Sequence, residues 1–244
     1  MLQQLRDAGV EGRDGAADPR QAVTDASRAL AAAGQSDMIW GHVSVRDPAG
    51  RGAWVKASPW GLEEVTPERV LLVGADGAVL EGEGPRHIEY PIHTCIYESR
   101  PDVGCVVHTH AKYATAFASL DVPLRPISHE GALFAPPDIA RFHLTGDLID
   151  TVELGVALAE SLGDRNAVLV SGHGIVTVGA DPAAAVMAAV LLDRACWMQL
   201  QLEAAGGPRR WSSDEEAVAK RSSVWSGRQL AGGWQYLLRR AAPR

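Results

Sequence analysis

Three histidines in two short motifs have the spacing of a metal site. His108 and His110 are separated by one residue at the end of an apolar, β-branched run, and His173 lies between two glycines. Residues two apart on a strand face the same side, so the first two imidazoles can converge on one point and the third can complete the set. Two histidines at this spacing also occur without a metal, one buried and one exposed. The Gly-flanked His173 favours the metal, because three protein ligands with one open position are typical of a catalytic zinc site.

A carboxylate upstream of these histidines could move protons. Glu89 lies in the segment HIEYPIHTCIYESR (87–100), whose apolar residues at helical spacing predict a partly buried helix, with His93 on the same face and able to pair with Glu89. A carboxylate beside a metal can act as ligand, general base or general acid, whereas most glutamates on helices are simply solvated. Burial beside Ile88 would raise its pKa and a nearby cation would lower it, and the sequence leaves this balance open.

The apolar patterns predict one α/β domain around these residues. Alternating short strand-like and helical segments are typical of a central sheet with helices on both faces. An Asp76-Gly77 turn between two apolar runs predicts a hairpin. Strands are expected at 42–47, 52–58, 69–82, 103–110 and 166–179, and helices at 19–34, 111–120, 150–163 and 181–206. The Pro-rich segment 123–144 is expected to be a loop with room for one strand. The predicted organisation is a flexible N-terminus (1–18), a domain (19–207) and a C-terminal helical extension (208–244).

Composition narrows the partners and the compartment. A net charge of −7 over 244 residues argues against a nucleic acid or an anionic membrane as partner. The three cysteines lack metal-site spacing and a disulfide framework, which indicates a reducing compartment. The first residues are charged, unlike a signal peptide, and no stretch is expected to reach the apolar length that spans a bilayer. The cytoplasm is therefore the expected location.

The order of these motifs resembles one known family. The stretch HIEYPIHTCIYESRPDVGCVVHTHAKYATAFA, with SGHGIVTVG and the upstream GHVSVRD, is similar to the class II aldolase and adducin family over roughly residues 19–204. The resemblance implies an α/β/α fold with a central, mostly antiparallel sheet, and a homotetramer with active sites between subunits. It also implies that His108, His110 and His173 bind zinc, with manganese, cobalt or iron as alternatives, that Glu89 is the catalytic acid or base, and that Tyr113 is a further candidate acid.

The chain departs from the sugar-phosphate members of that family where they hold the phosphate. Their G-N-x-S and S-S-E segments read Gly41-His42-Val43-Ser44 and His87-Ile88-Glu89 here. A phosphate pocket needs small donors, which Ile88 cannot supply, so a phosphorylated sugar is disfavoured. Aromatic rings and cations suit a planar carboxylate instead. The candidate substrate-binding residues are His42, Ser44, Arg46, Lys56, Trp60, Arg86 and His87.

Three functions are consistent with this pattern. The favoured one is a metal-dependent decarboxylase of a hydroxylated aromatic carboxylic or dicarboxylic acid, like another branch of the same family. The second is an aldolase that cleaves a hydroxy-keto acid or a sugar. In both reactions a carbon–carbon bond breaks and a Lewis acid stabilises the developing negative charge. The third is a non-catalytic, adducin-like assembly module, against which the complete set of three histidines and Glu89 speaks.

Overall fold

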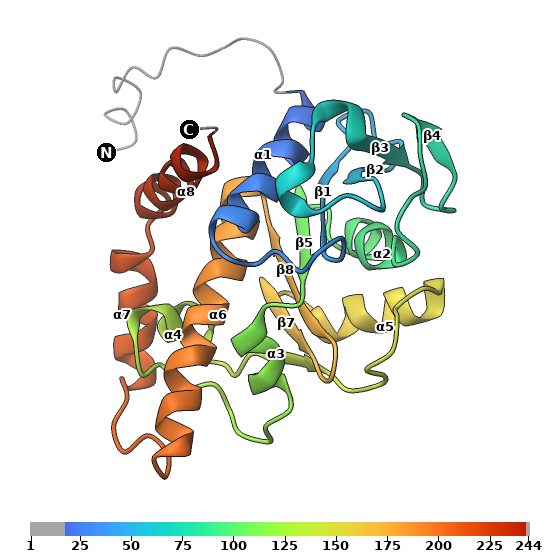
Figure 1. Cartoon of the computed structure of the whole chain (residues 1–244). Coiled ribbons are helices and arrows are strands. Elements are labelled where there is room, and N and C mark those ends of the chain that lie inside the picture. The colour runs from blue at the N-terminus through green and yellow to red at the C-terminus, as the bar shows by residue number, and fades with distance from the viewer. Residues whose placement is uncertain (1–17, 243–244) are drawn as a thin grey trace.

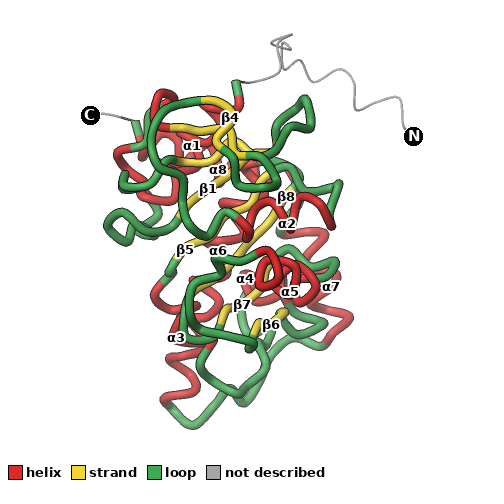
Figure 2. The backbone as a smooth tube through the Cα atoms, turned by 90° about the vertical axis from the view of Figure 1, so that its right-hand side faces the viewer, coloured by secondary structure: helices red, strands yellow, loops and turns green. Residues whose placement is uncertain are grey.

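The computed structural model describes residues 18–242, so the predicted flexible segment 1–18 lies outside the described residues except for Asp18. Eight strands form one sheet in the order β4-β3-β2-β1-β5-β8-β7-β6, and all neighbouring strands in the described part of the chain are antiparallel except β6 and β7. Figure 2 shows them as one twisted band from β4 to β6. The predicted α/β architecture with a mostly antiparallel central sheet is confirmed.

The elements follow the predicted alternation closely (Figure 1). The strands are β1 (His42–Arg46), β2 (Ala53–Lys56), β3 (Val70–Val73), β4 (Val79–Glu81), β5 (Cys105–Thr109), β6 (Ala140–Phe142), β7 (Ala167–Val170) and β8 (Gly174–Gly179). The helices are α1 (Pro19–Ala32), α2 (Pro91–Ser99), α3 (Lys112–Ala118), α4 (His129–Phe134), α5 (Val152–Leu162), α6 (Pro182–Ala204), α7 (Asp214–Val224) and α8 (Gly227–Ala241), with 3-10 turns at Leu62–Glu64 and Pro67–Arg69.

The strand period of two sends alternate residues of the central strands to two separate cores. Val107 of β5 packs in the core shared with α1, α3 and α6, whereas its neighbour Val106 packs in the core shared with α2 and α5. Helices therefore cover both faces of the sheet, and β5 and β8 are buried between them. The helices of the predicted C-terminal extension lie on this frame, α7 against α4 and α8 against α1 and α6.

The segment around Glu89 differs from the predicted helix. Helix α2 begins only at Pro91, which suits the first helical position because it has no N–H to leave unpaired. Glu89 therefore lies in the turn that precedes the helix. Ile92 is fully buried, but Ile88 is 54% exposed, so the expectation that both lie on one buried face was wrong.

The Pro-rich segment 123–144 contains more regular structure than predicted. The strand β6 is present, and the short helix α4 precedes it. The Ser128 side chain caps this helix by accepting a hydrogen bond from the Gly131 N–H. Ser128 and Glu130 are ordinary helix-start signals, and the surrounding prolines concealed them in the sequence.

One helix is as long and apolar as a membrane span, contrary to the expectation that no stretch would be. Among the described residues, α6 is long and apolar enough by length and composition to cross a membrane. However, 61% of its most apolar window is buried inside the fold, where the helix packs against β5, β8 and α3. The same apolar composition is what a central helix of a globular core requires.

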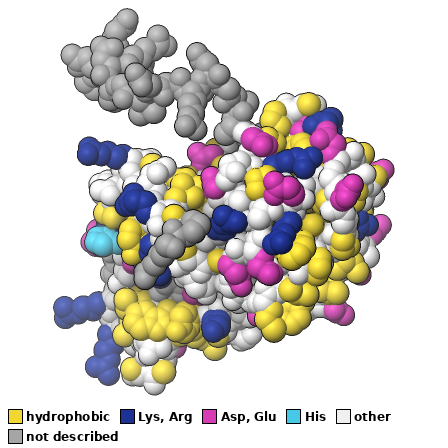
Figure 3. All heavy atoms as spheres, turned by 45° about the horizontal axis from the view of Figure 1, so that its top comes forward, with side chains coloured by type: hydrophobic (Ala, Val, Ile, Leu, Met, Phe, Trp, Pro, Cys, Tyr) yellow, Lys and Arg dark blue, Asp and Glu magenta, His cyan; other side chains and the backbone are white. Residues whose placement is uncertain are grey.

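On the face shown in Figure 3, acidic and basic side chains are interspersed with apolar ones.

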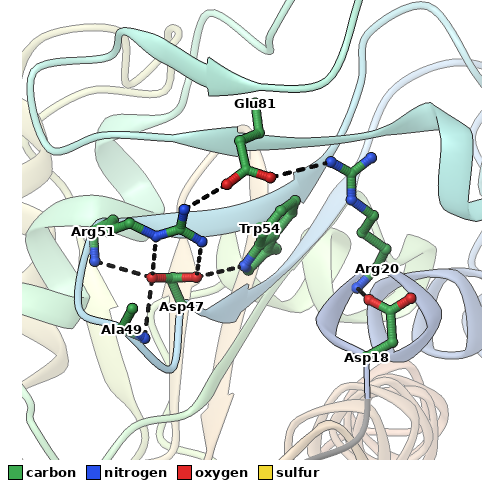
Figure 4. A network of polar contacts seen from close by, with 7 residues as sticks. All are labelled: Asp18, Arg20, Asp47, Ala49, Arg51, Trp54 and Glu81. Carbon is green, nitrogen blue, oxygen red and sulfur yellow. Dashed lines mark hydrogen bonds and ion pairs between the residues drawn. The ribbon is translucent and has the colours of Figure 1, made fainter.

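A buried carboxylate fixes the turn between β1 and β2 (Figure 4). The Asp47 side chain is 2% exposed and accepts hydrogen bonds from the Trp54 indole at 2.8 Å, from the Arg51 guanidinium at 2.9 Å, and from two backbone N–H groups. Arg51 also pairs with Glu81 of β4, which in turn contacts Arg20 of α1. One carboxylate therefore links the turn to an edge strand and, through it, to the first helix.

We expect Asp47→Asn to lower the free energy of unfolding at pH 7 by about 2–3 kcal/mol, because hydrogen bonds to a charged acceptor are lost. The Arg51 hydrogen bond holds the pKa of Asp47 well below its usual range. The stabilisation is therefore complete above the unfolded pKa of about 4 and is lost as pH falls through the folded pKa. Urea unfolding of the wild type and of Asp47→Asn, at pH 7 and below pH 4, should show that the difference in their unfolding free energies is smaller at the lower pH. The matched control is Asp102→Asn, which removes an exposed Asp–Arg pair and is expected to cost much less, because solvent screens the pair. An equal loss in both variants would contradict the prediction.

Candidate active site

The sheet brings the three predicted metal-binding histidines together. His108 lies on β5, His110 follows the end of that strand, and His173 lies in the turn between β7 and β8. Since β5 and β8 are antiparallel neighbours, the end of one meets the start of the other. Ligand nitrogens of the three side chains all lie within 4.8 Å of one another. A Cβ at Gly174 would lie 2.6 Å from the Thr109 carbonyl oxygen, so only glycine allows this approach.

The nitrogen atoms of this cluster fit a divalent metal ion. His108 Nδ1 lies 3.0 Å from the Ile175 carbonyl oxygen, and His110 Nδ1 lies 2.9 Å from the Asp37 carboxylate. Each contact places the ring proton on Nδ1 and leaves the Nε2 lone pair free, the arrangement found behind metal-bound histidines. Within the described chain, His108 Nε2, His110 Nε2 and His173 Nδ1 are buried without a hydrogen-bond partner. Such orphaned atoms are costly unless a ligand satisfies them.

Burial keeps the imidazoles of His108 and His173 neutral. It lowers the pKa of His108 well below its usual value and that of His173 to about 4, and repulsion from neighbouring imidazoles lowers both further. Neutral imidazoles have the free lone pair that a metal ligand needs.

Glu89 lies against the same cluster. Its Oε1 accepts a hydrogen bond from the Ile149 N–H at 2.9 Å and lies 3.5 Å from His173 Nε2. Its Oε2 lies 3.7 Å from His108 Nε2 and 3.8 Å from His42 Nε2. Burial raises the pKa of this carboxyl group, and the Ile149 hydrogen bond offsets part of that rise. The side chain is 8% exposed, so it can retain a proton at a higher pH than an ordinary glutamate.

No local pattern in the sequence indicates that Asp37, 73 residues before His110, orients that histidine. We expect Asp37→Asn to weaken binding of the metal by about 10- to 100-fold, the usual cost of losing a carboxylate behind a ligating histidine. Competition with a chromophoric chelator would measure the affinity. Glu63→Gln is a suitable control, because that exposed carboxylate contacts Ser36 rather than a histidine. Equal affinities of Asp37→Asn and wild type would contradict the prediction.

Four of the predicted substrate-binding residues lie beside Glu89 or close behind it. His42 of β1 is the cross-strand partner of His108, and the His87 ring lies 4.4 Å from the His42 ring. His87 Nε2 is buried without a partner in the described structure. Lys56 is buried, and its ammonium donates to the carbonyl oxygens of residues 39 and 60. Burial lowers the pKa of Lys56 to about 8. Burial also lowers the pKa values of His42 and His87, and the Lys56 charge adds to that effect. Ser44 lies two residues along β1 from His42, where its hydroxyl contacts His93.

The other candidates make contacts elsewhere. Arg46 lies at the far end of β1 and donates to carbonyl oxygens of Val103, Tyr97 and Arg100. Trp60 lies under the Arg69 guanidinium at 3.4 Å, and Arg86 donates to the carbonyl oxygens of Gly77 and His87. Tyr113 is 45% exposed beside Trp197, at a ring distance of 6.5 Å. None of these side chains has a recorded contact with the histidine cluster among residues 18–242, so their functional roles stay predictions.

His93 has a different partner from the expected one. Instead of pairing with Glu89, its Nε2 lies 2.6 Å from His42 Nδ1 and its Nδ1 lies 2.6 Å from the Ser44 hydroxyl. The start of α2 at Pro91 removes Glu89 from the helical face that the prediction had assumed. His93 therefore contacts the Nδ1 of His42, the ring nitrogen that does not face Glu89.

Comparison with known proteins agrees with this geometry. The model of the class II aldolase and adducin N-terminal domain matches residues 21–200. A 3,4-dihydroxyphthalate decarboxylase from Terrabacter sp. is 34% identical over 216 residues, which cover 84% of this chain and 90% of that protein. A 5-deoxy-D-ribulose 1-phosphate aldolase from Bacillus thuringiensis serovar kurstaki is 34% identical over 172 residues, 68% of this chain and 78% of that protein. Among solved structures, L-fuculose 1-phosphate aldolase from Glaciozyma antarctica PI12 superposes with a TM-score of 0.79 at 26% identity, covering 91% of this chain and 88% of that one.

Proposed function

The chain belongs to the class II aldolase and adducin family, and on this premise we propose that it is a divalent-metal-dependent lyase that decarboxylates a hydroxylated aromatic carboxylic acid. The observation that carries the proposal is the group of three histidines with unpartnered buried nitrogens around a buried Glu89. A divalent ion held by these histidines would supply a Lewis acid for negative charge that develops on the substrate. Zinc is the first candidate, and manganese, cobalt and iron also suit three imidazoles.

In this proposal Glu89 delivers the proton. The bond between the ring carbon and its carboxylate breaks, the electron pair stays on the carbon, and carbon dioxide leaves. Glu89 in its acid form then gives the Oε2 proton to that carbon and is reprotonated from solvent. Its raised pKa and the anchoring of Oε1 by the Ile149 N–H support this role, because the free oxygen faces the histidine cluster.

Two side chains close to Glu89, Lys56 and His87, support a carboxylate substrate. Lys56 has no carboxylate partner in the described structure, and His87 Nε2 is unpartnered, so both have hydrogen-bonding capacity left for a ligand. The decarboxylase from Terrabacter sp. that is 34% identical to this chain is named for an aromatic dicarboxylate, 3,4-dihydroxyphthalate. A planar acid with a hydroxyl group next to the carboxylate is therefore the substrate class that we propose.

Aldol cleavage is the second candidate, because the relative from Bacillus thuringiensis and the solved structure from Glaciozyma antarctica are both named aldolases. The three histidines and Glu89 would have the same roles in aldol cleavage, with an aldehyde as the leaving group in place of carbon dioxide. Ile88 offers no donor to a phosphate, which favours an unphosphorylated substrate if this candidate holds.

Turnover on a panel of hydroxylated phthalates and pyridine-dicarboxylates tests the proposal, with carbon dioxide and aldehyde measured in parallel. Carbon dioxide release that stops on chelation and returns on adding the metal would support the decarboxylase. Aldehyde from a hydroxy-keto acid or sugar, without carbon dioxide, would replace it by the aldolase. A protein that binds no metal and turns over nothing would leave only the assembly module.

We further propose a homotetramer in the cytoplasm, with Tyr113 acting as an additional acid at a neighbouring subunit's site. Apolar side chains that are exposed in the single chain near the site loops support an association, notably Met38 at 64%, Trp40 at 48% and Ile88 at 54%. Light scattering of the purified protein would give its mass, and a monomer would contradict this part of the proposal.

A further inference from the structure

A cavity of about 300 Å³ lies between α4, α7 and the loop that leads into β7. Helix α7 packs against α4 on this side of the molecule (Figure 1). The cavity is at the start of β7, where Ala167 lines it, whereas His173 follows the other end of that strand. It is therefore separate from the proposed active site. Its volume is at the lower end of the range for small-molecule sites, roughly 300–1,000 Å³.

One part of the cavity lining is apolar and firmly held. It consists of side chains from α4 and from the Pro-rich segment that follows this helix: Leu133, Phe134, Pro136, Pro137 and Ile139. Phe134 and Ile139 are buried members of the larger core cluster, and Leu133 packs against that cluster. Proline fixes its own φ angle, and core side chains are closely packed, so this wall keeps its shape without a ligand.

Arg165 lines the cavity from the loop before β7. Within residues 18–242 its guanidinium makes no hydrogen bond or ion pair, and its Nε is buried away from water without a partner. The backbone that carries it is anchored, because Arg100 donates to the carbonyl oxygens of Gly163 at 2.6 Å and Arg165 at 3.1 Å. The Val178 N–H donates to the carbonyl oxygen of Asn166 at 2.9 Å. An unpaired, partly buried cation on a fixed loop is costly unless a ligand accepts its hydrogen bonds.

A second arginine lines the cavity from α7. Arg221 donates from Nε to the Ala132 carbonyl oxygen at 3.0 Å and from Nη2 to the Pro136 carbonyl oxygen at 2.7 Å. These neutral acceptors hold the guanidinium in place and leave its charge uncompensated. Asp164 also lines the cavity, but it is exposed and forms no ion pair with either arginine in the described structure. Two cations against one exposed carboxylate leave the lining positively charged.

We propose that this cavity binds a small organic carboxylate with an apolar body, such as an aromatic acid. A guanidinium can donate two parallel hydrogen bonds to a carboxylate, and the apolar wall would cover the body of the ligand. An inorganic anion would leave that wall uncovered, which favours the organic acid. The ligand would join α7 to the loop before β7, because each segment supplies one arginine. The inference goes beyond the proposed function and does not depend on which reaction the active site performs.

Titration calorimetry of the full chain with benzoate tests the proposal. His110→Ala, which disables the proposed metal site, should still bind one equivalent of benzoate. Adding Arg165→Met should weaken this binding by about 10-fold or more, because a hydrogen bond to a charged group is lost. Neutral benzamide should bind about 10-fold or more weakly than benzoate for the same reason. Arg210→Met is the matched control, because it removes an exposed arginine that does not line the cavity, and its affinity should equal that of the parent protein.

Hydrogen–deuterium exchange locates the bound acid. A ligand that binds only the folded state slows local opening, so benzoate should protect the backbone amides of α7 and of residues 133–137. The protection should be present in wild type and in His110→Ala, and it should be lost in Arg165→Met. Circular dichroism shows whether Arg165→Met is folded. Arg165→Lys keeps the charge without the two-pronged donor and should have an affinity between those of Arg165→Met and the parent protein.

Four results would overturn the inference. The first is a His110→Ala protein that binds no benzoate, and the second is an unchanged affinity in folded Arg165→Met. The third is an equal loss of affinity in Arg210→Met, and the fourth is protection confined to the segments around Glu89 and His108. Inorganic phosphate that binds as tightly as benzoate would overturn the proposed ligand class. Failure of the proposed function is distinguishable, because it would appear in turnover and metal content and would leave these binding results unchanged.

Discussion

Replacing His108 with alanine is expected to reduce bound metal to background and to lower kcat by about 1000-fold or more. Each 1.36 kcal/mol of lost transition-state stabilisation costs a factor of ten, and a Lewis acid supplies several kcal/mol. The His108 ring lies 4.9 Å from that of His173 and 5.2 Å from that of His110, and those two rings lie 5.2 Å from each other, so the variant removes one of three equally close ligands. Elemental analysis of the purified variant and an assay of its turnover would measure both effects.

His108 is fully buried, so its variant also needs a test of folding. His110→Ala gives a second measurement, since the His110 side chain is 24% exposed and its removal leaves a smaller defect in the core. The control is His129→Ala, which removes an exposed histidine at the start of α4 and should leave metal content and kcat unchanged. A folded His108→Ala protein that keeps its metal would contradict the assignment of this histidine as a ligand.

The parts of the site that were predictable from sequence are those encoded by short local patterns. An HxH on a buried strand places two side chains on one side because of the strand period, and the Gly-flanked His173 belongs to a turn that needs a glycine at position 174. The flanking strands and long helices were equally visible, because their apolar periodicity extends over many residues. The Asp76-Gly77 hairpin is a similar case of local chemistry.

The parts that were not predictable depend on contacts between distant segments. Nothing local to Asp37 indicates that it reaches His110, and nothing local to His93 indicates that it contacts His42. The pairing of β1 with β5 accounts for the place of His42 in the site, since it puts His42 opposite His108. The start of α2 was misplaced for a related reason, because helical spacing alone does not show that Pro91 begins the helix.

Substituting Glu89 by glutamine separates proton transfer from metal binding. Glutamine has nearly the same shape and can still accept the Ile149 N–H, but its amide cannot deliver the proton. We expect kcat to fall by about 100- to 10,000-fold, the usual contribution of a positioned general acid, with metal content unchanged. Glu98→Gln, an exposed glutamate on α2, is the control and should retain full activity. Loss of the metal in Glu89→Gln would instead identify Glu89 as a ligand, and full activity would assign the proton to another group.

The same variant should be at least as stable as the wild type once the metal is removed. Burial raises the pKa of Glu89 in the folded state, so ionisation at neutral pH opposes folding, whereas below the unfolded pKa of about 4.3 the group is neutral in both states. A neutral amide avoids that penalty. Urea unfolding of the chelated proteins should therefore show Glu89→Gln more stable at pH 7, with the gap closing as pH falls below about 4. A variant less stable than wild type at pH 7 would show that the carboxylate is favoured in the fold, and Glu89 would then be a base or ligand rather than an acid. A gain in stability with a loss of turnover is the result expected of a group that the fold retains for its chemistry.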